Sequence, residues 1–354
     1  MVKIAFTGGG TIGHVAVNMA IIPEAQRENI TCIYIGSKNG IEQEVITKQF
    51  PDVKYYSISS GKLRRYISVE NVKDVFKVQK GVLDALKILK KEKPDLVFSK
   101  GGFVAVPVTI AAKILNIKTI IHESDVTPGL ANRIALKFAH KMYTTFEKTL
   151  DYIPDGSGDY VGSIIRNELF AGNKQQGYAL TQFNSNKPIL LIMGGSLGSK
   201  VINDIIFNHI DELLHSYQII HLVGKGNRNQ IKKEGYYQLE YAGEELMHLF
   251  KITDYVISRA GSNAIFEFLA LKKPMILVPL GKDQSRGDQI DNAAQFKSQG
   301  YASVIDEPLF SYATLTKQLD YIKNHQHEIL QAMNSMTTRY TAHELLNKII
   351  QDAK

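Results

Sequence analysis

The chain twice repeats a unit in which a short apolar run leads into a glycine turn and then into a helix-like segment. The first unit reads IAFTGGGTIGHV from Ile4, and the second reads ILLIMGGSLGSKV from Ile189. Near-continuous apolar strands separated by helices are typical of a parallel sheet that is covered on both faces. The sequence therefore predicts an α/β protein built from two doubly wound, Rossmann-like halves.

The other strands and helices follow the same alternation. Strands are predicted at 2–7, 31–35, 53–57, 96–99, 119–122 and 141–144, and then at 189–193, 219–223, 237–240, 255–258, 275–278 and 302–305. Helices in the first half are predicted at 13–28, 40–49, 69–91, 104–115 and 129–139. The stretch Asp151 to Gly162, with Pro154 and several Gly and Asp residues, indicates the way out of the first half.

Length and composition exclude several classes of protein. With 354 residues the chain is long enough for two domains, and 44% hydrophobic and 22% charged residues are typical of a soluble globular protein. The first residues run straight into a strand without a signal peptide, and the longest apolar run, 103–112, is shorter than the ~18 residues of a membrane span. The only cysteine, Cys32, lies in an apolar strand and is expected to be buried. We expect a cytoplasmic protein.

A carboxylate in an apolar helix is the first sign of a ligand site in the second half. Glu267 lies within a run of apolar and small residues, where an ionised carboxylate needs hydrogen-bond donors. The two vicinal hydroxyls of a ribose are such donors. Gly261 and Ser262 lead into the same helix, and its N-terminus favours a phosphate. Each residue alone also suits an ordinary helix surface or cap.

Two side-chain amides follow on the next helix. Gln289 and Asn292 are three residues apart and share one helical face, where they can meet the hydroxyls of a sugar. Open α/β sheets bind ligands at the carboxyl ends of their strands, where these groups are expected. Ribose, phosphate and sugar groups in one segment together indicate a nucleotide-sugar site.

Several longer motifs carry a family resemblance. SRAGSNAIFE and DQSRGDQIDNA, with GGGTIGHV, GGFVAVP, HESDVTPGLAN and GGSLGSKVIN, resemble the MurG family of peptidoglycan N-acetylglucosaminyltransferases, in the form carried by low-GC Gram-positive bacteria. The resemblance covers essentially the whole chain. It implies the GT-B fold, two doubly wound Rossmann-like domains facing across a cleft: residues 1–162 with the final helix at 342–354 as acceptor and membrane-facing domain, and 163–341 as UDP-sugar donor domain.

The resemblance also implies an activity. It would be inverting transfer of N-acetylglucosamine from UDP-N-acetylglucosamine to the C4 hydroxyl of undecaprenyl-linked lipid I, giving lipid II. No cofactor is implied, and the chain has no Asp-x-Asp pair to hold a metal on a nucleotide diphosphate. The only close histidine pair, His325-x-His327, lies far from every motif. A GT-B enzyme with another lipid acceptor, such as diacylglycerol, is the alternative within this fold.

A rival class comes from the first glycine turn. Gly8, Gly10 and Gly13 satisfy G-x-G-x-x-G between a strand and a helix, which is the fingerprint of an NAD(P)-dependent oxidoreductase. That site also needs an acid at the end of the second strand, and the strand ends here in Gly36-Ser37. The family resemblance instead implies that the turn, with Gly9, Gly10, Thr11 and Gly13, faces the diphosphate of the acceptor. Ile12 departs from the glycine usual in relatives.

Candidate catalytic groups follow the strands of the first half. His14 comes directly after the glycine turn at a helix N-terminus that favours neutral imidazole, so it is a candidate general base. A capping or phosphate-facing histidine is an equal alternative. His122 and Glu123 end a neighbouring strand and are its rivals, although a structural pairing explains them as well.

Further binding residues are implied by the resemblance. Gly101, Gly102 and Asn132 would hold the acceptor, although Asp125 stands where many relatives carry Asn. On the donor side, Arg166 could meet the diphosphate or be a solvated linker residue, and Ser196 would bind phosphate in the turn after Gly194-Gly195. Arg259 would stack on the base or lie near it, and the sequence does not decide between the two. The loop 241–247 would offer backbone groups to the uracil edge.

Positive charge gathers in one segment of the first half. Between Lys62 and Lys93 there are ten Lys and Arg against four acids, without any nucleic-acid motif. Lys73, Lys77, Lys80, Lys87 and Lys91 share a helical face, Val72, Phe76, Leu83, Leu86 and Leu89 are expected on the packed side, and Lys62, Arg64 and Arg65 precede them beside Leu63, Tyr66 and Ile67. We expect this segment to bind an anionic inner-leaflet surface, which places the protein peripherally on the cytoplasmic face of the cell membrane.

Overall fold

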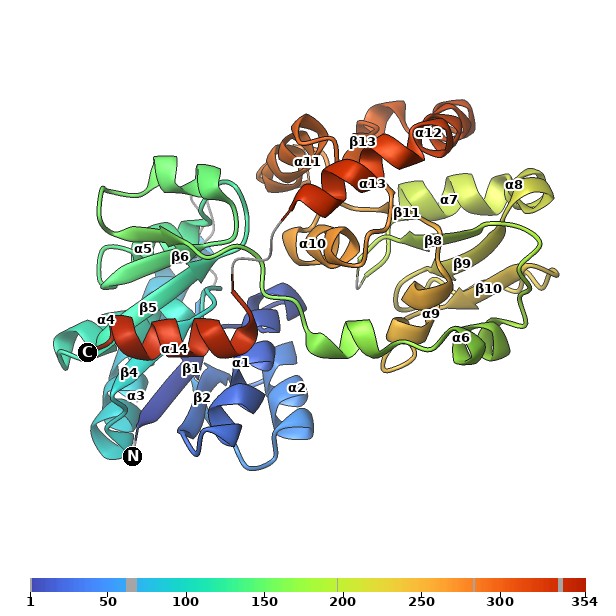
Figure 1. Cartoon of the computed structure of the whole chain (residues 1–354). Helices are drawn as coiled ribbons and strands as arrows, with labels where there is room; N and C mark the ends of the chain where they lie inside the picture. The colour runs from blue at the N-terminus through green and yellow to red at the C-terminus, as the bar shows by residue number, and fades with distance from the viewer. Residues whose placement is uncertain (1, 62–68, 196, 283, 337–339) are drawn as a thin grey trace. The chain divides into compact units, whose positions relative to one another are not determined.

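The computed structural model describes residues 2–61, 69–195, 197–282, 284–336 and 340–354, with only the backbone of residues 69–73 and 75. The chain folds as two compact units (Figure 1). The first unit is Met1–Ile165 together with Thr338–Lys354, and the second unit is Arg166–Thr337. Ser196, residues 62–68 and the side chains of Val72 and Lys73, all assigned roles above, lie outside the described residues.

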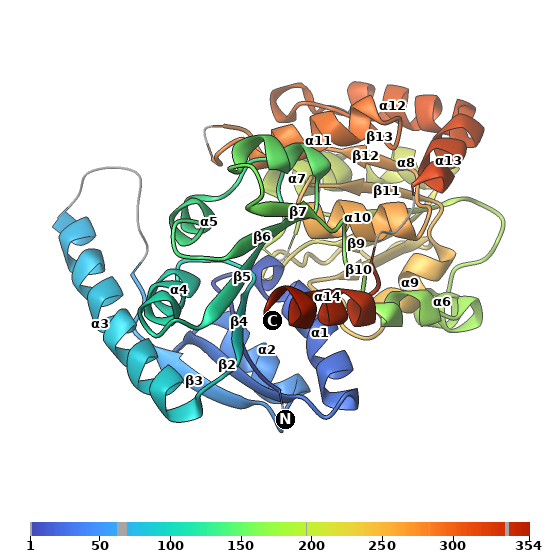
Figure 2. The same cartoon turned by 60° about the vertical axis from the view of Figure 1, so that its left-hand side comes forward.

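The first unit is a parallel sheet covered by helices (Figure 2). Its described elements are β1 (Lys3–Thr7), η1 (Ile12–His14), α1 (Ala16–Arg27), β2 (Thr31–Ser37), α2 (Ile41–Gln49), β3 (Lys54–Ile58), α3 (Val69–Glu92), β4 (Leu96–Ser99), α4 (Ala105–Ile114), β5 (Lys118–Glu123), α5 (Leu130–Ala135), β6 (Lys141–Thr144), η2 (Glu147–Tyr152), β7 (Gly158–Tyr160) and, at the end of the chain, α14 (Ala342–Asp352). The strand order is β3-β2-β1-β4-β5-β6-β7. This is the doubly wound order, extended by one strand at the edge.

Both faces of this sheet are buried, which explains the continuous apolar strands. Ile4 and Phe6 of β1 pack into one core cluster, and Ala5 packs into the cluster on the opposite face. Phe6 also meets Phe98 of β4 edge to face, with ring centroids 6.2 Å apart. Because successive side chains of a strand point to opposite faces, every residue of β1 that faces a core has to be apolar.

The last helix, α14, packs on α1 of the first unit. Its Leu345, Leu346 and Ile349 are completely buried in the same cluster as β1. Thr341 and Glu344 form a capping box at its start, and the Asp352 carboxylate near its end accepts a hydrogen bond from the Tyr143 hydroxyl at 2.6 Å. Apolar burial and polar bonds thus hold both ends of the helix on this unit.

One expectation about α3 is wrong. Phe76 and Leu83 were expected on the packed side, yet they are 65% and 60% exposed. The buried residues of the helix, which packs against α4, include Ala85 and Leu89. Phe76 and Leu83 are seven residues apart and therefore share the face of Lys80, whereas Ala85 and Leu89 belong to another face. Lys77, Lys80, Lys87 and Lys91 are exposed as expected.

The second unit repeats the architecture. Its described elements are η3 (Asn167–Ala171), α6 (Lys174–Thr181), β8 (Ile189–Met193), α7 (Lys200–Asn208), α8 (Ile210–Ser216), β9 (Gln218–Leu222), β10 (Tyr236–Leu239), α9 (Leu246–Ile252), β11 (Tyr255–Ser258), α10 (Ser262–Ala270), β12 (Met275–Leu277), α11 (Asp288–Ser298), β13 (Ala302–Val304), η4 (Glu307–Leu309), α12 (Tyr312–Asn324) and α13 (Gln326–Ser335). The strands run parallel in the order β10-β9-β8-β11-β12-β13.

Most predicted elements agree with the structure, with two differences in the first unit. The stretch Asp151 to Gly162 contains β7, which pairs with β6, whereas the sequence indicated only a connection. Glycine and aspartate are depleted in strands, so this three-residue edge strand carries no local signal. Helix α5 ends at Ala135 and not near residue 139.

Three smaller expectations can be checked directly. Cys32 is buried, and burial raises the pKa of its thiol to about 12. His325 and His327 are both exposed. Within the described part of the chain, no helix combines the length and the apolar character that a membrane span requires.

Candidate functional site

Each sheet has a point where the strand order reverses. In the first unit this point lies between β1 and β4, and in the second unit it lies between β8 and β11. Ligands of open α/β folds bind outside the carboxyl ends of the strands at such points. The turns at Gly8–Gly10 and Gly101–Gly102 occupy this place in the first unit, and those at Gly194–Gly195 and Ala260–Gly261 occupy it in the second.

The two glycine turns of the first unit interlock. The Gly9 N–H donates to the Gly101 carbonyl at 3.3 Å. Gly101 and Gly102 have φ of +91° and +83°, and a Cβ on Gly102 would clash with the carbonyl oxygen of Gly9. Only glycine allows this approach. Binding of the acceptor diphosphate by Gly9, Gly101 and Gly102 remains a prediction.

Because the two turns approach so closely, adding a single methyl group at Gly102 is expected to destabilise the first unit strongly. Gly102→Ala is expected to lower the free energy of unfolding of the first unit by roughly 2–4 kcal/mol, since positive φ and a backbone clash add together. Gly156→Ala is the matched control, because Gly156 has φ of +76° with open space around it, and should cost roughly 1–2 kcal/mol. Urea denaturation of both variants measures the difference. Equal losses would show that the Gly9 contact contributes nothing.

A buried acid, Glu42, fills the space beside the first turn. Its carboxylate accepts from Gly10 N at 3.0 Å, from Ser37 N at 2.9 Å and from Ser37 Oγ at 2.5 Å. The Gly10 N–H, which the sequence assigned to an acceptor phosphate, therefore serves Glu42 in this structure. Glu42 also lies near the end of β2, where an oxidoreductase would place its ribose-binding acid, but three internal donors already occupy it.

Two further residues, which sequence analysis did not identify, fix the carbonyls of this turn. Asn18 Nδ2 donates to the Thr7 carbonyl at 3.1 Å, and the Tyr34 hydroxyl donates to the Gly8 carbonyl at 2.8 Å. Both side chains are completely buried, and burial raises the pKa of Tyr34. A polar residue on the buried face of a helix, such as Asn18, was the only available signal.

The sequence placed His14 at the start of a helix after the turn, whereas in the structure it precedes α1, which begins at Ala16. It ends η1 and is half-buried, next to the exposed residues Thr11 and Ile12 and half-buried Gly13. His14 Nδ1 is 3.1 Å from Thr11 Oγ1. If Nδ1 carries the proton and donates to Thr11, Nε2 keeps a lone pair that can accept a proton from a substrate hydroxyl.

His122, by contrast, is completely buried inside the first unit. The residue has no exposed surface, and neither ring nitrogen has a hydrogen-bond partner among the described residues. Burial, helped by the nearby Lys100 ammonium, holds the pKa of His122 well below its usual value, so the ring is neutral. A ring in this position does not reach a substrate hydroxyl. The geometry therefore gives no support to His122 as the base.

Glu123 is also turned inward. Its carboxylate accepts from the backbone N–H groups of Ser124 at 2.8 Å, Asp125 at 3.0 Å and Gly129 at 2.9 Å. Asn132 Nδ2 donates to the same carboxylate at 2.9 Å. Through these four hydrogen bonds Glu123 holds the loop after β5 in place. Because its carboxylate oxygens are engaged in these bonds, Glu123 is poorly suited to proton transfer. Asn132 is buried, and its Oδ1 faces Gly101.

Lys100 is a buried cation that the sequence analysis overlooked. It lies between β4 and Gly101, is 2% exposed, and its ammonium donates to Ser124 Oγ. Burial lowers the pKa of Lys100, while the charges of Glu123 and Asp125 raise it. A lysine directly between an apolar strand and two glycines was the signal that could have identified it.

In the second unit, the start of α10 is open. Gly261 is the N-cap, no side chain caps the helix in the described structure, and a Cβ on Gly261 would meet nothing within 4 Å. Ser262 is buried as the first residue of the helix. An uncapped helix N-terminus with free space before it is suited to a phosphate, as the sequence predicted for Gly261 and Ser262.

Gln289 and Asn292 of α11 meet at this same turn. Gln289 Oε1 accepts from Ala260 N at 3.3 Å and from Leu280 N at 3.0 Å, while Asn292 Nδ2 donates to the Ala260 carbonyl at 3.2 Å. Asn292 is completely buried and Gln289 is half-buried. The structure thus brings both residues to the turn at Ala260–Gly261, which the sequence assigned to the donor. Asn292 orients the backbone there, whereas the bonds of Gln289 leave its amide hydrogens to other partners.

Glu267 and Arg166, both predicted as donor residues, are partners. Arg166 Nη2 is 3.1 Å from Glu267 Oε1, and the side chain of Glu267 is 16% exposed. Burial raises the pKa of Glu267, and the Arg166 charge opposes that shift. The carboxylate retains Oε2 for further donors, which fits one ionised group serving both a guanidinium and a ribose.

The guanidinium of Arg259 binds partners inside the second unit. Its Nη1 donates to the Val278 carbonyl at 3.1 Å, and Nη2 pairs with the Glu307 carboxylate. Both side chains are about one-tenth exposed, so the pair fixes the end of β12 against η4. The geometry therefore supports a structural position and not stacking on a base. Tyr241, which opens the loop assigned to uracil, is exposed.

Comparison with known proteins gives the family. The N-terminal domain model of glycosyltransferase family 28 matches residues 4–144, and the C-terminal domain model of the same family matches residues 189–349. The chain belongs to glycosyltransferase family 28. Its relative in Staphylococcus aureus is 61% identical over 354 residues, covering 100% of this chain and 99% of that protein. That relative is named UDP-N-acetylglucosamine--N-acetylmuramyl-(pentapeptide) pyrophosphoryl-undecaprenol N-acetylglucosamine transferase.

Solved structures agree on the fold of this family 28 chain. MurG of Acinetobacter baumannii matches with a TM-score of 0.74 at 20% identity, covering 99% of both chains. The glycosyltransferase of kitacinnamycin matches with a TM-score of 0.76 at 10% identity, covering 100% of this chain and 99% of that one. The predicted class, two doubly wound Rossmann-like domains of the GT-B type, is confirmed. Membership of family 28 replaces the oxidoreductase interpretation of the first glycine turn.

Proposed function

We propose that this protein transfers N-acetylglucosamine from UDP-N-acetylglucosamine to the C4 hydroxyl of the N-acetylmuramyl unit of lipid I, forming lipid II with inversion. The observation that carries the proposal is 61% identity over the full length to the transferase of that name from Staphylococcus aureus. The match covers 100% of this chain and 99% of that protein, so the substrates named for the relative apply here in preference to diacylglycerol.

Product analysis tests this assignment. Purified protein with radiolabelled UDP-N-acetylglucosamine should transfer label to a lipid I analogue and leave diacylglycerol unlabelled, and a chelator should not change the rate. The new linkage should be β, because an inverting enzyme acts on an α-linked donor. Label on diacylglycerol alone would contradict the acceptor, and an α linkage would contradict inversion.

The second unit is proposed to bind the donor. The open start of α10 receives phosphate, Glu267 accepts from the ribose hydroxyls, and Gln289 offers its amide to the sugar. Arg166, already paired with Glu267, supplies positive charge for the leaving diphosphate. Asn292 and Arg259 act indirectly, by holding the backbone at Ala260 and Val278.

The first unit is proposed to bind the acceptor. The backbone around Gly9 to Gly13 and Gly101 to Gly102 forms the approach to the acceptor diphosphate, and His14 takes the proton from the attacking hydroxyl. Glu42, Asn18 and Tyr34 fix the shape of this turn from behind. His122 and Glu123 are proposed as supports of the loop after β5.

A membrane surface is proposed as a further partner of the first unit, through α3. Phe76 and Leu83 are exposed on the face that also carries Lys80, Lys87 and Lys90. Exposed apolar side chains among lysines suit a helix that lies on an anionic leaflet, where each charge contributes about 1 kcal/mol. This surface would keep the protein near its lipid-linked acceptor on the cytoplasmic face of the membrane.

Vesicle binding tests the role of α3. Lys80→Glu with Lys87→Glu should weaken co-sedimentation with phosphatidylglycerol vesicles by roughly tenfold or more, because two attractive charges become repulsive. Phe76→Ser with Leu83→Ser should weaken binding as well and leave its salt dependence intact. Leu309→Ser is the control, since Leu309 is 64% exposed in the second unit. Binding that is indifferent to salt and to anionic lipid would exclude this electrostatic role.

A further inference from the structure

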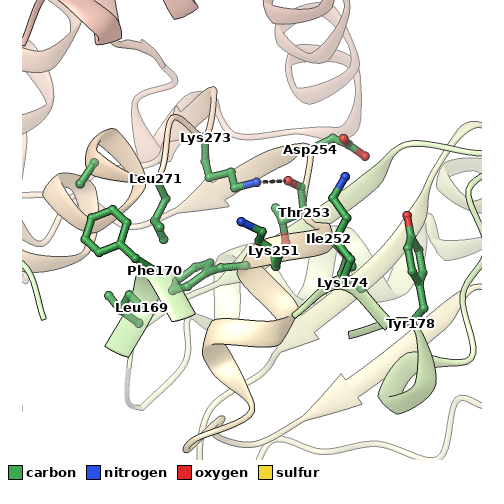
Figure 3. A pocket seen from close by; sticks show the side chains of 12 residues that line it. Leu169, Phe170, Lys174, Tyr178, Lys251, Ile252, Thr253, Asp254, Leu271 and Lys273 are labelled. Atoms are coloured by element: carbon green, nitrogen blue, oxygen red, sulfur yellow. Dashed lines mark hydrogen bonds between the residues drawn. The ribbon is translucent and has the colours of Figure 1, made fainter. Parts of the chain in front are cut away.

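The second unit has a pocket of about 410 Å³ near the points where the strands β11 and β12 begin (Figure 3). The proposed donor turn is Ala260–Gly261. Asp254 and Lys273 line the pocket, and they lie just before the amino ends of β11 and β12. The donor turn follows the carboxyl end of β11. Helix α10 connects the two places, because it begins at the donor turn and its last residue, Ala270, lines the pocket. The pocket is therefore separate from the proposed donor site.

Three lysines from three elements line this pocket. Lys174 starts α6, Lys251 lies in the last turn of α9, and Lys273 precedes β12. Asp254 is the one acid among the lining residues, and its Oδ2 already accepts from Ile189 N at 2.7 Å. Among the lining residues, three positive charges thus face one negative charge.

The position of Lys174 is informative, because a helix dipole disfavours a cation there. The first turn of a helix favours negative charge, and the last turn favours positive charge. Lys251 is explained by its place in the last turn of α9, but Lys174 at the first position of α6 is not. Lys174 is exposed, and an anion in front of it would offset the unfavourable interaction of its charge with the helix end.

Lys273 is the least exposed of the three lysines. Its Nζ donates to the Thr253 carbonyl at 2.6 Å, as the dashed line in Figure 3 shows. Burial lowers the pKa of Lys273 to about 8; Asp254 opposes this shift, and the charges of Lys251 and Lys174 add to it. A bound anion would stabilise the charged form of all three amines.

The wall also has an apolar part, besides Tyr178 and Thr253. Leu169 and Leu271 line the pocket with Phe170, whose ring is 51% exposed. We propose that this pocket binds a small phosphorylated molecule, with its phosphate on Lys174, Lys251 and Lys273 and its apolar part over Phe170. The volume falls within the range of pockets for small ligands, which is roughly 300–1,000 Å³.

Pyridoxal 5′-phosphate is a suitable probe, because it carries both a phosphate and an aldehyde. The unprotonated Nζ of Lys273 attacks the aldehyde carbon, an imine forms with loss of water, and added borohydride reduces the imine to a stable secondary amine. The reaction is run on the whole protein with saturating UDP, which keeps the probe out of the donor site. Peptide mass spectrometry then locates the label. Lys272 is the matched control, because it precedes Lys273, donates to the Met333 carbonyl and does not line the pocket.

Lys273 should be labelled at least roughly tenfold faster than Lys272, because the phosphate of the probe, held by Lys174 and Lys251, brings the aldehyde close to the Lys273 amine. Inorganic pyrophosphate should slow that labelling severalfold. In Lys174→Met/Lys251→Met the protection should be lost while Lys273 still reacts. Lys225→Met/Lys232→Met should keep the protection, because it changes two exposed lysines of the same unit that do not line the pocket. Absence of preferential labelling at Lys273 would overturn the proposal. So would labelling that pyrophosphate does not slow, or protection that survives in the Lys174→Met/Lys251→Met variant.

Discussion

Glu267→Ala is expected to weaken UDP binding by about 2–4 kcal/mol, or roughly thirty- to several-hundred-fold. In the proposed site the carboxylate accepts from both ribose hydroxyls, and the substitution removes both charge-assisted bonds. It also removes the partner of Arg166, which lies 3.1 Å away. Titration calorimetry with UDP measures the loss. Glu328→Ala is the control, because Glu328 is an exposed acid on α13 of the same unit.

A second ligand separates the ribose role from a general loss of structure. 2′,3′-Dideoxy-UDP lacks both hydroxyl donors, so it should bind the wild type weakly and lose little further affinity in Glu267→Ala. If both ligands lost the same free energy in the variant, the carboxylate would act through Arg166 or the fold and not through the ribose. Gln289→Ala should leave UDP affinity intact and weaken the full sugar nucleotide.

The pKa of Glu267 gives the same hypothesis a pH dependence. Burial raises this pKa above the usual 4.5, and only the ionised carboxylate accepts from two hydroxyls. As the pH falls through the raised pKa, the group takes up a proton and UDP affinity should decrease, starting at a higher pH than an exposed glutamate would give. Glu267→Gln should bind more weakly at neutral pH and lose this acid dependence. A dependence unchanged in Glu267→Gln would assign the titration to another group.

The sequence predicted the fold well where a local pattern carries it. Strands such as β1, β8 and β11 are buried on both faces, so each is a continuous apolar run whose end is marked by glycine or a polar residue. Helix α11 begins at Asp288, and it carries Gln289 and Asn292 as the sequence predicted. β7 was missed because a short edge strand needs only backbone pairing with β6.

The sequence identified many residues of the candidate site, but it did not show which partners those residues contact. Gln289 and Asn292 do meet at Ala260, in the turn that leads into the helix of Glu267, because two helices begin at neighbouring strand ends. The partners of Arg259 lie 19 and 48 residues further along the chain, so no local pattern showed that its guanidinium points inward. Glu42 reaches Gly10 across 32 residues for the same reason. Long-range pairing of polar groups is decided by packing, which spacing along the chain does not encode.

His14→Ala is expected to lower kcat by roughly 10²–10⁴-fold while leaving UDP-N-acetylglucosamine affinity intact. The attacking hydroxyl has to lose its proton as the new glycosidic bond forms, and the donor residues belong to the other unit. The half-buried position of His14 after the glycine turn suits this role, whereas His122 is sealed and Glu123 is held by four donors. Single-turnover rates together with a separate binding measurement distinguish chemistry from donor affinity.

Thr11 provides the sharper test, because it sets the tautomer. For Nε2 to accept a proton, Nδ1 must carry the hydrogen and donate it to Thr11 Oγ1, the atom 3.1 Å away. Thr11→Val keeps the shape and removes the acceptor, so kcat should fall by roughly five- to thirtyfold, about the effect of 1–2 kcal/mol, while Thr11→Ser should stay close to the wild type. The acid limb of the pH–rate profile should vanish in His14→Ala and persist in His122→Leu, a variant that changes a buried ring and leaves the turn in place. If the limb persists in His14→Ala and disappears in His122→Leu, the base is His122, and the buried ring must then become exposed during turnover.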